Sequence, residues 1–307
     1  MIITLNQPFS FCQMGQRDNQ EDSRFPNSNR PQDCKPFFIV CDGVGGSADG
    51  EVASMAVART LGKSLNAFDW RQTFTQDDCR KALTKAYQAL TVAAPHQDTD
   101  MATTLAMICF HKGGCSAVHI GDSRIYQYRP QVGLVFRSSD HSLVNELVHA
   151  GVISPEEALT HPRRSTINRY MAPDSDDEEH SNATWYTTDN VLPGDIFFIC
   201  TDGVVDTIDD KSLEDIICGA GSDEEKCELI AQMSSDSDDN NTAFLVSVAS
   251  VTAAEANDEE LDDDSNINQT KRIIHTSPVA VDIEAEEFAS DGVGEIVRWI
   301  KKKLNLN

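Results

Sequence analysis

The chain has 307 residues, enough to bury a large core in one or two domains, and a formal net charge of −25 at neutral pH. Such a charge argues against binding to nucleic acids or to anionic membrane surfaces, and no apolar run approaches the ~18 residues of a membrane span. Nine cysteines without a CxxC pair, and an N-terminus without a basic segment followed by an apolar one, predict reduced thiols, no secretory signal and a cytoplasmic location.

Strand-like runs alternate with helical patterns from residue 1 to about residue 250. An apolar run at 37–41 predicts a buried strand, and apolar residues at every fourth position predict a helix over 50–67. A second helix is expected over 82–93. Because the strand candidates are apolar almost throughout, they are typical of sheets covered on both faces.

Further along the chain, strands over 103–110, 114–120 and 125–129 are expected to form a β-meander with short turns. A helix over 140–150 follows. Residues 174–179 form an acidic insert, which is most simply a solvated loop.

Composition divides the chain into three parts. Residues 1–251 are expected to form the main folded domain, and residues 252–269 are polar and acidic, as in a flexible linker. Residues 270–307 form a C-terminal tail in which we expect one short strand and one basic amphipathic helix.

Four aspartates lie at the ends of apolar, strand-like runs, beside residues that turn the backbone sharply. Asp42, Asp122 and Asp202 each follow such a run, and Asp239 precedes the last one. Buried strands hold their ends rigidly, so carboxylates gathered at one rim would repel each other unless a cation lay between them. Oxygen ligands suit Mg²⁺ and Mn²⁺, so the pattern predicts a divalent metal site built by a sheet.

Each of these motifs has an ordinary alternative. Taken singly, the Asp-Gly pairs at 42–43 and 202–203 are common turns, and Asp122 could cap a turn through its side chain. Residues 43–48 also meet the looser dinucleotide fingerprint GxGxxA. However, no second strand ending in an acidic residue follows at the expected distance, and the repetition of run, aspartate and turn favours the metal site.

Six short segments, in this order along the chain, resemble the signature of the metal-dependent type 2C serine/threonine protein phosphatases. They are GQRDNQED at 15–22, DGVGG at 42–46, MATT at 101–104, GDSR at 121–124, TDGVVD at 201–206 and DNNT at 239–242. The bacterial branch fits best, because SDHSLV at 139–144 and HPRR at 161–164 are similar to its flap segment. The resemblance covers about residues 10–250. It implies an α+β fold, a four-layer α-β-β-α sandwich of two antiparallel sheets flanked by helices, with metals in a cleft at one end.

The resemblance also implies two Mg²⁺ or Mn²⁺ ions. Asp42 would bridge them, and Asp202 and Asp239 would complete the ligands of one ion. Glu21 and the backbone carbonyl of Gly43 would hold the other. Glycine at position 43 lets the backbone approach the metals closely.

A third, weaker metal site is implied by the match of Asp122 and Asp206, together with Asp202, to the family pattern. One departure lies nearby: many eukaryotic members have a histidine at the position of Val44, and that histidine is implied to protonate the leaving alcohol. Valine cannot donate a proton, so another side chain or a water on the metal would have to do so. Ala102, where a glycine is usual, is expected to affect packing only.

The implied activity is hydrolysis of phosphoserine and phosphothreonine by attack of a metal-bridging hydroxide, without a covalent enzyme intermediate. Arg17 would grip the phosphate oxygens as a bidentate donor. Asp22 would orient a metal-bound water, and Asn240 would orient the ligands by hydrogen bonding to them without contacting the metal itself. The implied partners are phosphorylated proteins, among them a serine/threonine kinase and its targets, and membrane binding is not expected.

Three rival functions remain to be weighed. A catalytically weak relative could act as a phosphoprotein-binding regulatory module, but the intact ligand set argues against it. A thiol phosphatase would need an arginine six positions after a cysteine, and no cysteine here has one. An acidic ion-binding scaffold would not explain Arg17 or the glycine turns.

Overall fold

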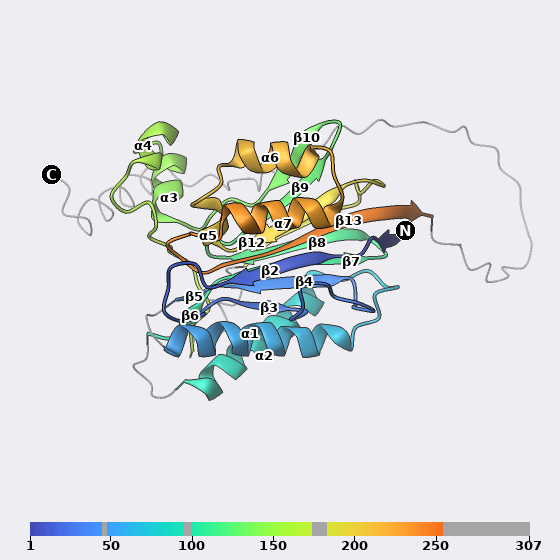
Figure 1. Cartoon of the computed structure of the whole chain (residues 1–307). Coiled ribbons are helices and arrows are strands. Elements are labelled where there is room, and N and C mark those ends of the chain that lie inside the picture. Colours follow the sequence, from blue (N-terminus) through green and yellow to red (C-terminus); the bar gives the residue numbers. More distant parts are fainter. Residues whose placement is uncertain (45–47, 95–99, 174–182, 254–307) are drawn as a thin grey trace, which may run out of the picture. The chain divides into compact units, whose positions relative to one another are not determined.

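Two antiparallel sheets are stacked face to face in the computed structural model, with helices over both outer faces (Figure 1). The structure describes residues 1–44, 48–94, 100–173 and 183–253. The chain divides into two units, Met1–Ala256 and Asn257–Asn307, and only the first contains described residues. The predicted tail and all but the start of the predicted linker, with the acidic insert, lie outside the described residues. The expected α+β sandwich of two flanked antiparallel sheets is confirmed.

The first sheet has five strands in the order β11-β8-β7-β4-β3, and neighbouring strands are antiparallel. Its strands are β3 (Ser23–Phe25), β4 (Phe37–Cys41), β7 (Leu105–His111), β8 (Gly114–Ile120) and β11 (Thr184–Thr188). Two short strands, β5 (Gly43–Val44) and β6 (Ala102–Thr103), pair with each other. In the sequence, β5 follows β4 and β6 precedes β7.

The second sheet has the order β1-β13-β12-β9-β10, and β2 also pairs with β13. Its strands are β1 (Ile2–Leu5), β2 (Phe9–Gln13), β9 (Arg124–Arg129), β10 (Gly133–Arg137), β12 (Ile196–Cys200) and β13 (Asn241–Thr252). The long β13 accommodates both N-terminal strands on one side, because β2 pairs with its first half and β1 with its second.

Helices form the outer layers (Figure 1). The five-stranded sheet is covered by α1 (Ala48–Asn66) and α2 (Gln76–Ala93), and the other sheet by α6 (Asp210–Cys218) and α7 (Asp223–Met233). The remaining described helices are the short α3 (Leu143–His149), α4 (Pro155–Leu159) and α5 (Asp202–Val205). Among the helices that the structure describes, none is long and apolar enough to cross a bilayer.

Strand β4 shows why the apolar runs are nearly continuous. Phe37, Ile39 and Cys41 pack in the core beneath α1 and α2, whereas Phe38 and Val40 pack in the core between the two sheets. Successive side chains of a strand point to opposite faces, so a strand in an inner layer needs apolar residues at every position. Strand β12 divides its residues in the same way between the inter-sheet core and the core beneath α6 and α7.

The expected β-meander is wrong in its third strand. Strands β7 and β8 form the expected hairpin, but β9 pairs with β10 and β12 in the other sheet. The chain crosses between sheets at Gly121. Its φ of +100° is a backbone conformation that residues other than glycine rarely adopt. A Cβ there would also lie 2.7 Å from a side-chain carbon of Thr104. The crossover places Asp122 between the end of β8 in one sheet and the start of β9 in the other.

The helix over 50–67 is observed as α1 with nearly the expected bounds, and two later helices begin at caps that the apolar pattern alone did not reveal. Helix α2 starts six residues before the expected position 82, because Thr75 and Asp78 form a capping box. Helix α3 starts at Leu143 rather than residue 140, because Ser142 caps it by accepting from the backbone N–H of Asn145.

Candidate metal centre and active site

The four aspartates of the strand-end pattern meet at one rim of the sandwich. Asp42 follows β4, Asp122 lies in the crossover from β8 to β9, and Asp202 begins α5 directly after β12. Asp239 precedes β13, which runs antiparallel to β12, so the start of β13 lies beside the end of β12. The carboxyl groups of Asp42, after β4 of one sheet, and Asp202, after β12 of the other, lie close enough for each to shift the pKa of the other.

Burial gives these carboxylates an unfavourable electrostatic environment. It raises the pKa of Asp42 well above its usual range, with Asp202 and Asp22 adding repulsion. Burial, followed by repulsion from Asp202, raises the pKa of Asp122 to about 7. The pKa of Asp202 is raised to about 6, again chiefly by burial, and that of Asp206 is raised for the same reason. A divalent cation among these groups would remove the repulsion and favour their charged forms.

The chemistry of the rim fits a hard divalent cation. All candidate ligands are oxygen atoms, and Oδ1 of Asp22 and Oδ1 of Asp202 are buried without a hydrogen-bond partner. A buried polar atom left unpaired costs about 1–3 kcal/mol, so each of these oxygens would gain from a cation. In the described part of the chain, no three acidic, cysteine or histidine side chains form a ready-made coordination cluster. A cation would therefore have to draw the rim carboxylates closer together.

Glu21 is held at the same rim by its backbone. Its carbonyl accepts from the N–H of Gly43 at 3.1 Å and from Oγ of Ser54 at 2.5 Å, and its own N–H donates to Oδ1 of Asn240 at 2.7 Å. A Cβ on Gly50 would lie 2.9 Å from Oε2 of Glu21, and one on Gly43 would lie 2.2 Å from the carbonyl oxygen of Gly50. The Glu21 carboxylate therefore lies close to the backbone of Gly43, its expected co-ligand.

Asn240 joins the N-terminal segment to the start of β13. Its Nδ2 donates to the carbonyls of Met14 at 2.8 Å and Asn19 at 2.9 Å, while its Oδ1 accepts from Glu21. Its backbone N–H donates to Oδ1 of Asp239 at 2.8 Å. Asn240 thus links two predicted metal ligands, Glu21 through its side-chain amide and Asp239 through its backbone N–H.

Asp22 is buried beside the end of β12. Its Oδ2 accepts from the hydroxyl of Thr201 at 2.9 Å, and burial, together with the charges of Asp202 and Asp239, raises its pKa to about 8. The hydroxyl of Thr201 also accepts from the backbone N–H of Thr242 at 3.0 Å. These bonds orient the Asp22 carboxyl and leave its Oδ1 without a partner.

Arg17 lies at the mouth of this site with a half-exposed side chain. Its Nη2 is 2.6 Å from Oδ2 of Asp239, and its Nε donates to the carbonyl of Asp238 at 3.1 Å. The predicted phosphate-binding residue therefore pairs with a predicted metal ligand. A cation on Asp239 would compete with the guanidinium for that carboxylate.

Comparison with known proteins identifies the family. The model of the family described as protein phosphatase 2C matches residues 18–236. The serine/threonine phosphatase stp of Listeria welshimeri is 30% identical over 242 residues, which cover 75% of this chain and 90% of the relative. The chain belongs to the protein phosphatase 2C family. Its predicted enzyme class, a protein-serine/threonine phosphatase, is confirmed by this family match and by the relatives.

Solved structures of the protein phosphatase 2C family share the fold. Stp1 from Staphylococcus aureus matches with a TM-score of 0.64 and 26% identity, covering 80% of this chain and 97% of that one. The catalytic domain of the phosphatase PstP, in complex with two manganese ions, matches with a TM-score of 0.64 and 24% identity, covering 80% and 99% of the two chains. The similarity to bacterial enzymes agrees with the expected bacterial branch.

Residues 101–104 match the family signature, but sequence reasoning assigned Thr103 and Thr104 no role in this phosphatase 2C site. The hydroxyl of Thr103 and the backbone N–H of Thr104 both donate to the carbonyl of Asp42, at 2.8 Å each. The hydroxyl of Thr104 accepts from the N–H of Asp42 at 3.0 Å and lies 2.7 Å from Oγ of Ser123. These residues join the Asp42 loop to the Asp122 turn. The available signal was a pair of β-branched hydroxyl residues at the start of an otherwise apolar strand.

The flap segment of this phosphatase lies beside the rim. A cavity of about 480 Å³ is lined by Asp122, Asp202 and Asp206 on one side and by residues of the α3–α4 region on the other. Arg164 lines it too, and its charge opposes the effect of burial on the pKa of Asp206. Arg163, its neighbour in sequence, is not among the lining residues.

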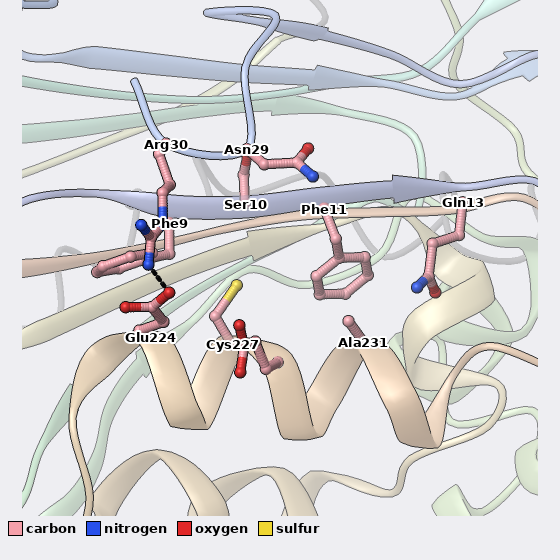
Figure 2. A pocket seen from close by; sticks show the side chains of 10 residues that line it. Phe9, Ser10, Phe11, Gln13, Asn29, Arg30, Glu224, Cys227 and Ala231 are labelled. Carbon is pink, nitrogen blue, oxygen red and sulfur yellow. Dashed lines mark ion pairs between the residues drawn. The ribbon is translucent and has the colours of Figure 1, made fainter. Parts of the chain in front are cut away.

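A second cavity, of about 560 Å³, lies between β2 and α7 (Figure 2). Figure 2 shows Phe11 pointing from β2 towards α7, and Arg30 pairing with Glu224 at the other end of the cavity. Arg30 also lies over the ring of Phe9, 5.5 Å from its centroid. No residue of the predicted site lines this cavity, so its size does not mark the reaction centre.

Proposed function

We propose that this phosphatase hydrolyses phosphoserine and phosphothreonine in proteins with two divalent cations, Mg²⁺ or Mn²⁺, and a third that binds more weakly. The observation that supports this most is the meeting of buried, mutually repelling carboxylates at one rim, with two buried oxygens lacking any partner. The two manganese ions in the PstP structure, which has the same fold, agree with this proposal.

The ligands follow from the positions at the rim. Asp42 would contact both ions, because its neighbour Gly43 donates its N–H to the Glu21 carbonyl and its own carboxyl group lies near Asp202. Asp202 and Asp239 would hold one ion, and Glu21 with the carbonyl of Gly43 the other. When bound, the ions would lower the pKa of a water molecule between them, which supplies a hydroxide that can attack phosphorus near neutral pH.

The third ion would lie on the flap side of the rim. Asp122 and Asp206 line the cavity there together with Asp202. Asp206 lies one helical turn after Asp202, with its N–H donating to the Asp202 carbonyl at 2.8 Å, so both residues lie on the same side of α5.

Other residues of the chain orient the reactants. Arg17, once freed from Asp239, would donate two parallel hydrogen bonds to phosphate oxygens. Asp22 is held by Thr201 through Oδ2, so its partnerless Oδ1 is available to accept from the attacking water. Val44 in β5 has no proton to give, so this chain has no histidine acid at that position for the leaving alcohol.

The substrates would be phosphorylated proteins in the cytoplasm, a serine/threonine kinase and its targets among them, with a role in signalling. A catalytically weak module that only binds phosphoproteins is the alternative. The retention of every acidic residue of the family signature argues against it, since phosphoprotein binding alone would not need them.

The test is release of phosphate from a phosphothreonine peptide. We expect turnover with Mn²⁺, none with excess chelator, and a loss of at least ~100-fold for Asp42→Asn, because a charge between two cations is removed. Asp77→Asn, on the exposed start of α2, is the matched control and should change nothing. Asp122→Asn should keep most turnover at saturating Mn²⁺ and raise the Mn²⁺ concentration required. Turnover that survives chelation, or an Asp42→Asn variant as active as the wild type, would refute the proposal.

A further inference from the structure

His141 makes two hydrogen bonds to the residue that precedes Asp122. Its ring Nδ1 accepts from the backbone N–H of Gly121 at 3.1 Å, and its backbone N–H donates to the carbonyl of Gly121 at 2.9 Å. The same histidine therefore holds both polar backbone groups of the glycine with φ of +100° at the crossover. The position of the Asp122 turn depends on a residue 20 positions away in sequence.

The other ring nitrogen reaches a third segment. Nε2 of His141 lies 2.7 Å from Oγ1 of Thr184, the first residue of β11. A backbone N–H can only donate, so Nδ1 must be unprotonated and the neutral ring carries its proton on Nε2. Burial, with His119 and Arg169 nearby, lowers the pKa of His141 to about 3, which agrees with a neutral ring. The ring thus accepts from Gly121 and donates to Thr184.

His119 fixes the plane of this ring. The two imidazoles are stacked with centroids 4.4 Å apart and an angle of 15° between the rings. Nε2 of His119 donates to the carbonyl of Ser139 at 2.9 Å, two residues before His141. His119 lies in β8, opposite Thr184 in β11, so the stack joins the five-stranded sheet and its crossover to the segment that leads into α3.

The two ends of the flap segment lie side by side, next to His141. Ser142, next to His141, caps α3 and forms an isolated bridge with Ile167. The carbonyl of His141 accepts from the N–H of Asn168 at 3.0 Å. The segment from 142 to 168, which lines the cavity beside the rim, is therefore closed at its base by His141.

We propose that His141 is a positioning residue that holds the Asp122 turn and the base of the flap together. Its ring touches neither the phosphate nor a predicted metal ligand. Instead, it fixes the Gly121 peptide, and through it the direction of the Asp122 carboxylate towards the cavity. The proposal rests on the proposed function for its effect on catalysis, but the bonds themselves can be tested without turnover.

The chain provides a matched control in His111. Its Nδ1 accepts from the N–H of Gly113 at 3.0 Å, and its Nε2 lies 2.9 Å from Oγ of Ser116. Burial lowers its pKa to about 4. His111 thus has the same pattern of partners as His141, but it lies at the hairpin of β7 and β8, the opposite end of β8 from Asp122.

The experiment compares four variants of the whole chain. His141→Gln loses the acceptor for Gly121, His141→Asn keeps an oxygen near the position of Nδ1, Thr184→Val removes the acceptor of Nε2, and His111→Gln is the control. The first readout is hydrogen exchange of the Gly121 amide in the metal-free protein, and the second is Mn²⁺ binding by titration calorimetry. Wild-type ring nitrogen shifts should show the proton on Nε2.

For His141→Gln we expect Gly121 exchange to accelerate and the weakest Mn²⁺ affinity to fall, each by roughly five- to tenfold. His141→Asn and Thr184→Val should show smaller changes, and His111→Gln none. KM for a phosphopeptide should rise more than kcat falls. If His141→Gln matches His111→Gln in exchange and in Mn²⁺ binding, the proposal is wrong. If His141→Gln does not fold, Thr184→Val decides: wild-type exchange at Gly121 together with unchanged Mn²⁺ binding in that variant would refute the proposal.

These outcomes are distinct from failure of the proposed function. A wild-type protein that releases no phosphate would refute the phosphatase mechanism while exchange at Gly121 still tests the role of His141. Variants with normal exchange, Mn²⁺ binding and turnover would leave the phosphatase intact and refute the positioning role alone.

Discussion

Individual aspartates at the rim destabilise the metal-free protein, because burial and mutual repulsion raise their pKa values. The ordinary pKa of Asp is near 3.8, whereas those of Asp202, Asp122 and Asp22 are about 6, 7 and 8. The folded protein therefore retains protons that the unfolded chain has already released. Between these values, each rise in pH favours the unfolded chain.

We accordingly predict that the melting temperature of the chelated protein falls as pH rises from about 4 to about 8, the window set by the ordinary value and by Asp22. Mn²⁺ should raise the melting temperature at every pH, and more at pH 8 than at pH 5, because protons compete with the cation. Thermal denaturation with and without chelator measures this. Asp22→Asn should flatten the upper part of the curve, and a chelated protein most stable at pH 8 would contradict the argument.

The hydroxyl of Thr104 is a second residue-scale determinant of the site. It accepts from the N–H of Asp42 and contacts Oγ of Ser123, and its side chain is buried. Thr104→Val keeps the shape but leaves the Asp42 N–H without its acceptor, so we expect a loss of about 1–3 kcal/mol in the free energy of unfolding and reduced turnover. Urea denaturation and phosphate release measure the two effects. Thr104→Ser restores the hydroxyl and is the control; equal losses for both variants would attribute the effect to packing.

At the scale of elements, the strands and their covering were predictable and the crossover was not. The apolar runs of β4 and β12 indicate strands buried on both faces, and each strand does divide its residues between two cores. The turn after β8 is as short as that of a hairpin, so no local pattern distinguishes pairing with β8 from entry into the other sheet. The start of α2 was readable from the capping box at Thr75 and Asp78, a signal that the apolar spacing did not include.

Elements also explain which site residues the sequence revealed. The aspartates were predictable because each lies at a strand end, where local sequence records both the strand and the turn. Thr103, Thr104 and His141 were not, because their partners lie on other elements; His141 meets Thr184 across 43 positions. Their roles depend on tertiary convergence, which one sequence without its fold does not encode locally.

The flap is an element whose charge can be tested. Arg164 lines the cavity beside Asp206, whereas Arg163 does not, so the two neighbours form a matched pair. We predict that Arg164→Gln raises KM for a phosphopeptide by about two- to tenfold, a modest effect because the side chain is exposed. KM for a small aryl phosphate should change less, because that substrate has no peptide to contact the flap. Steady-state kinetics on both substrates decide this. Arg163→Gln should be closer to the wild type, and equal KM changes for both substrates would favour a structural role for Arg164.

At the scale of the whole molecule, a net charge of −25 concentrates cations around the protein and supports a metal-requiring rim, while giving it no attraction to nucleic acids. All proposed ligands lie between Glu21 and Asp239, and the strands that carry them belong to one sandwich. The sandwich in turn requires β13 in full, because β1 pairs with its second half up to Thr252.

Removing residues 254–307 should therefore leave catalysis intact. We predict that a chain ending at Ala253 hydrolyses an aryl phosphate with kcat within about twofold of the full chain and with a similar melting temperature, because every proposed ligand and every strand pairing is retained. A chain ending at Ser247 is the contrasting variant: it loses the partner of β1, from Leu5↔Val248 to Ile2↔Thr252, and should melt several degrees lower. If the chain ending at Ala253 is folded but inactive towards the aryl phosphate, then the tail belongs to the catalytic unit and the division at residues 251 and 252 is wrong.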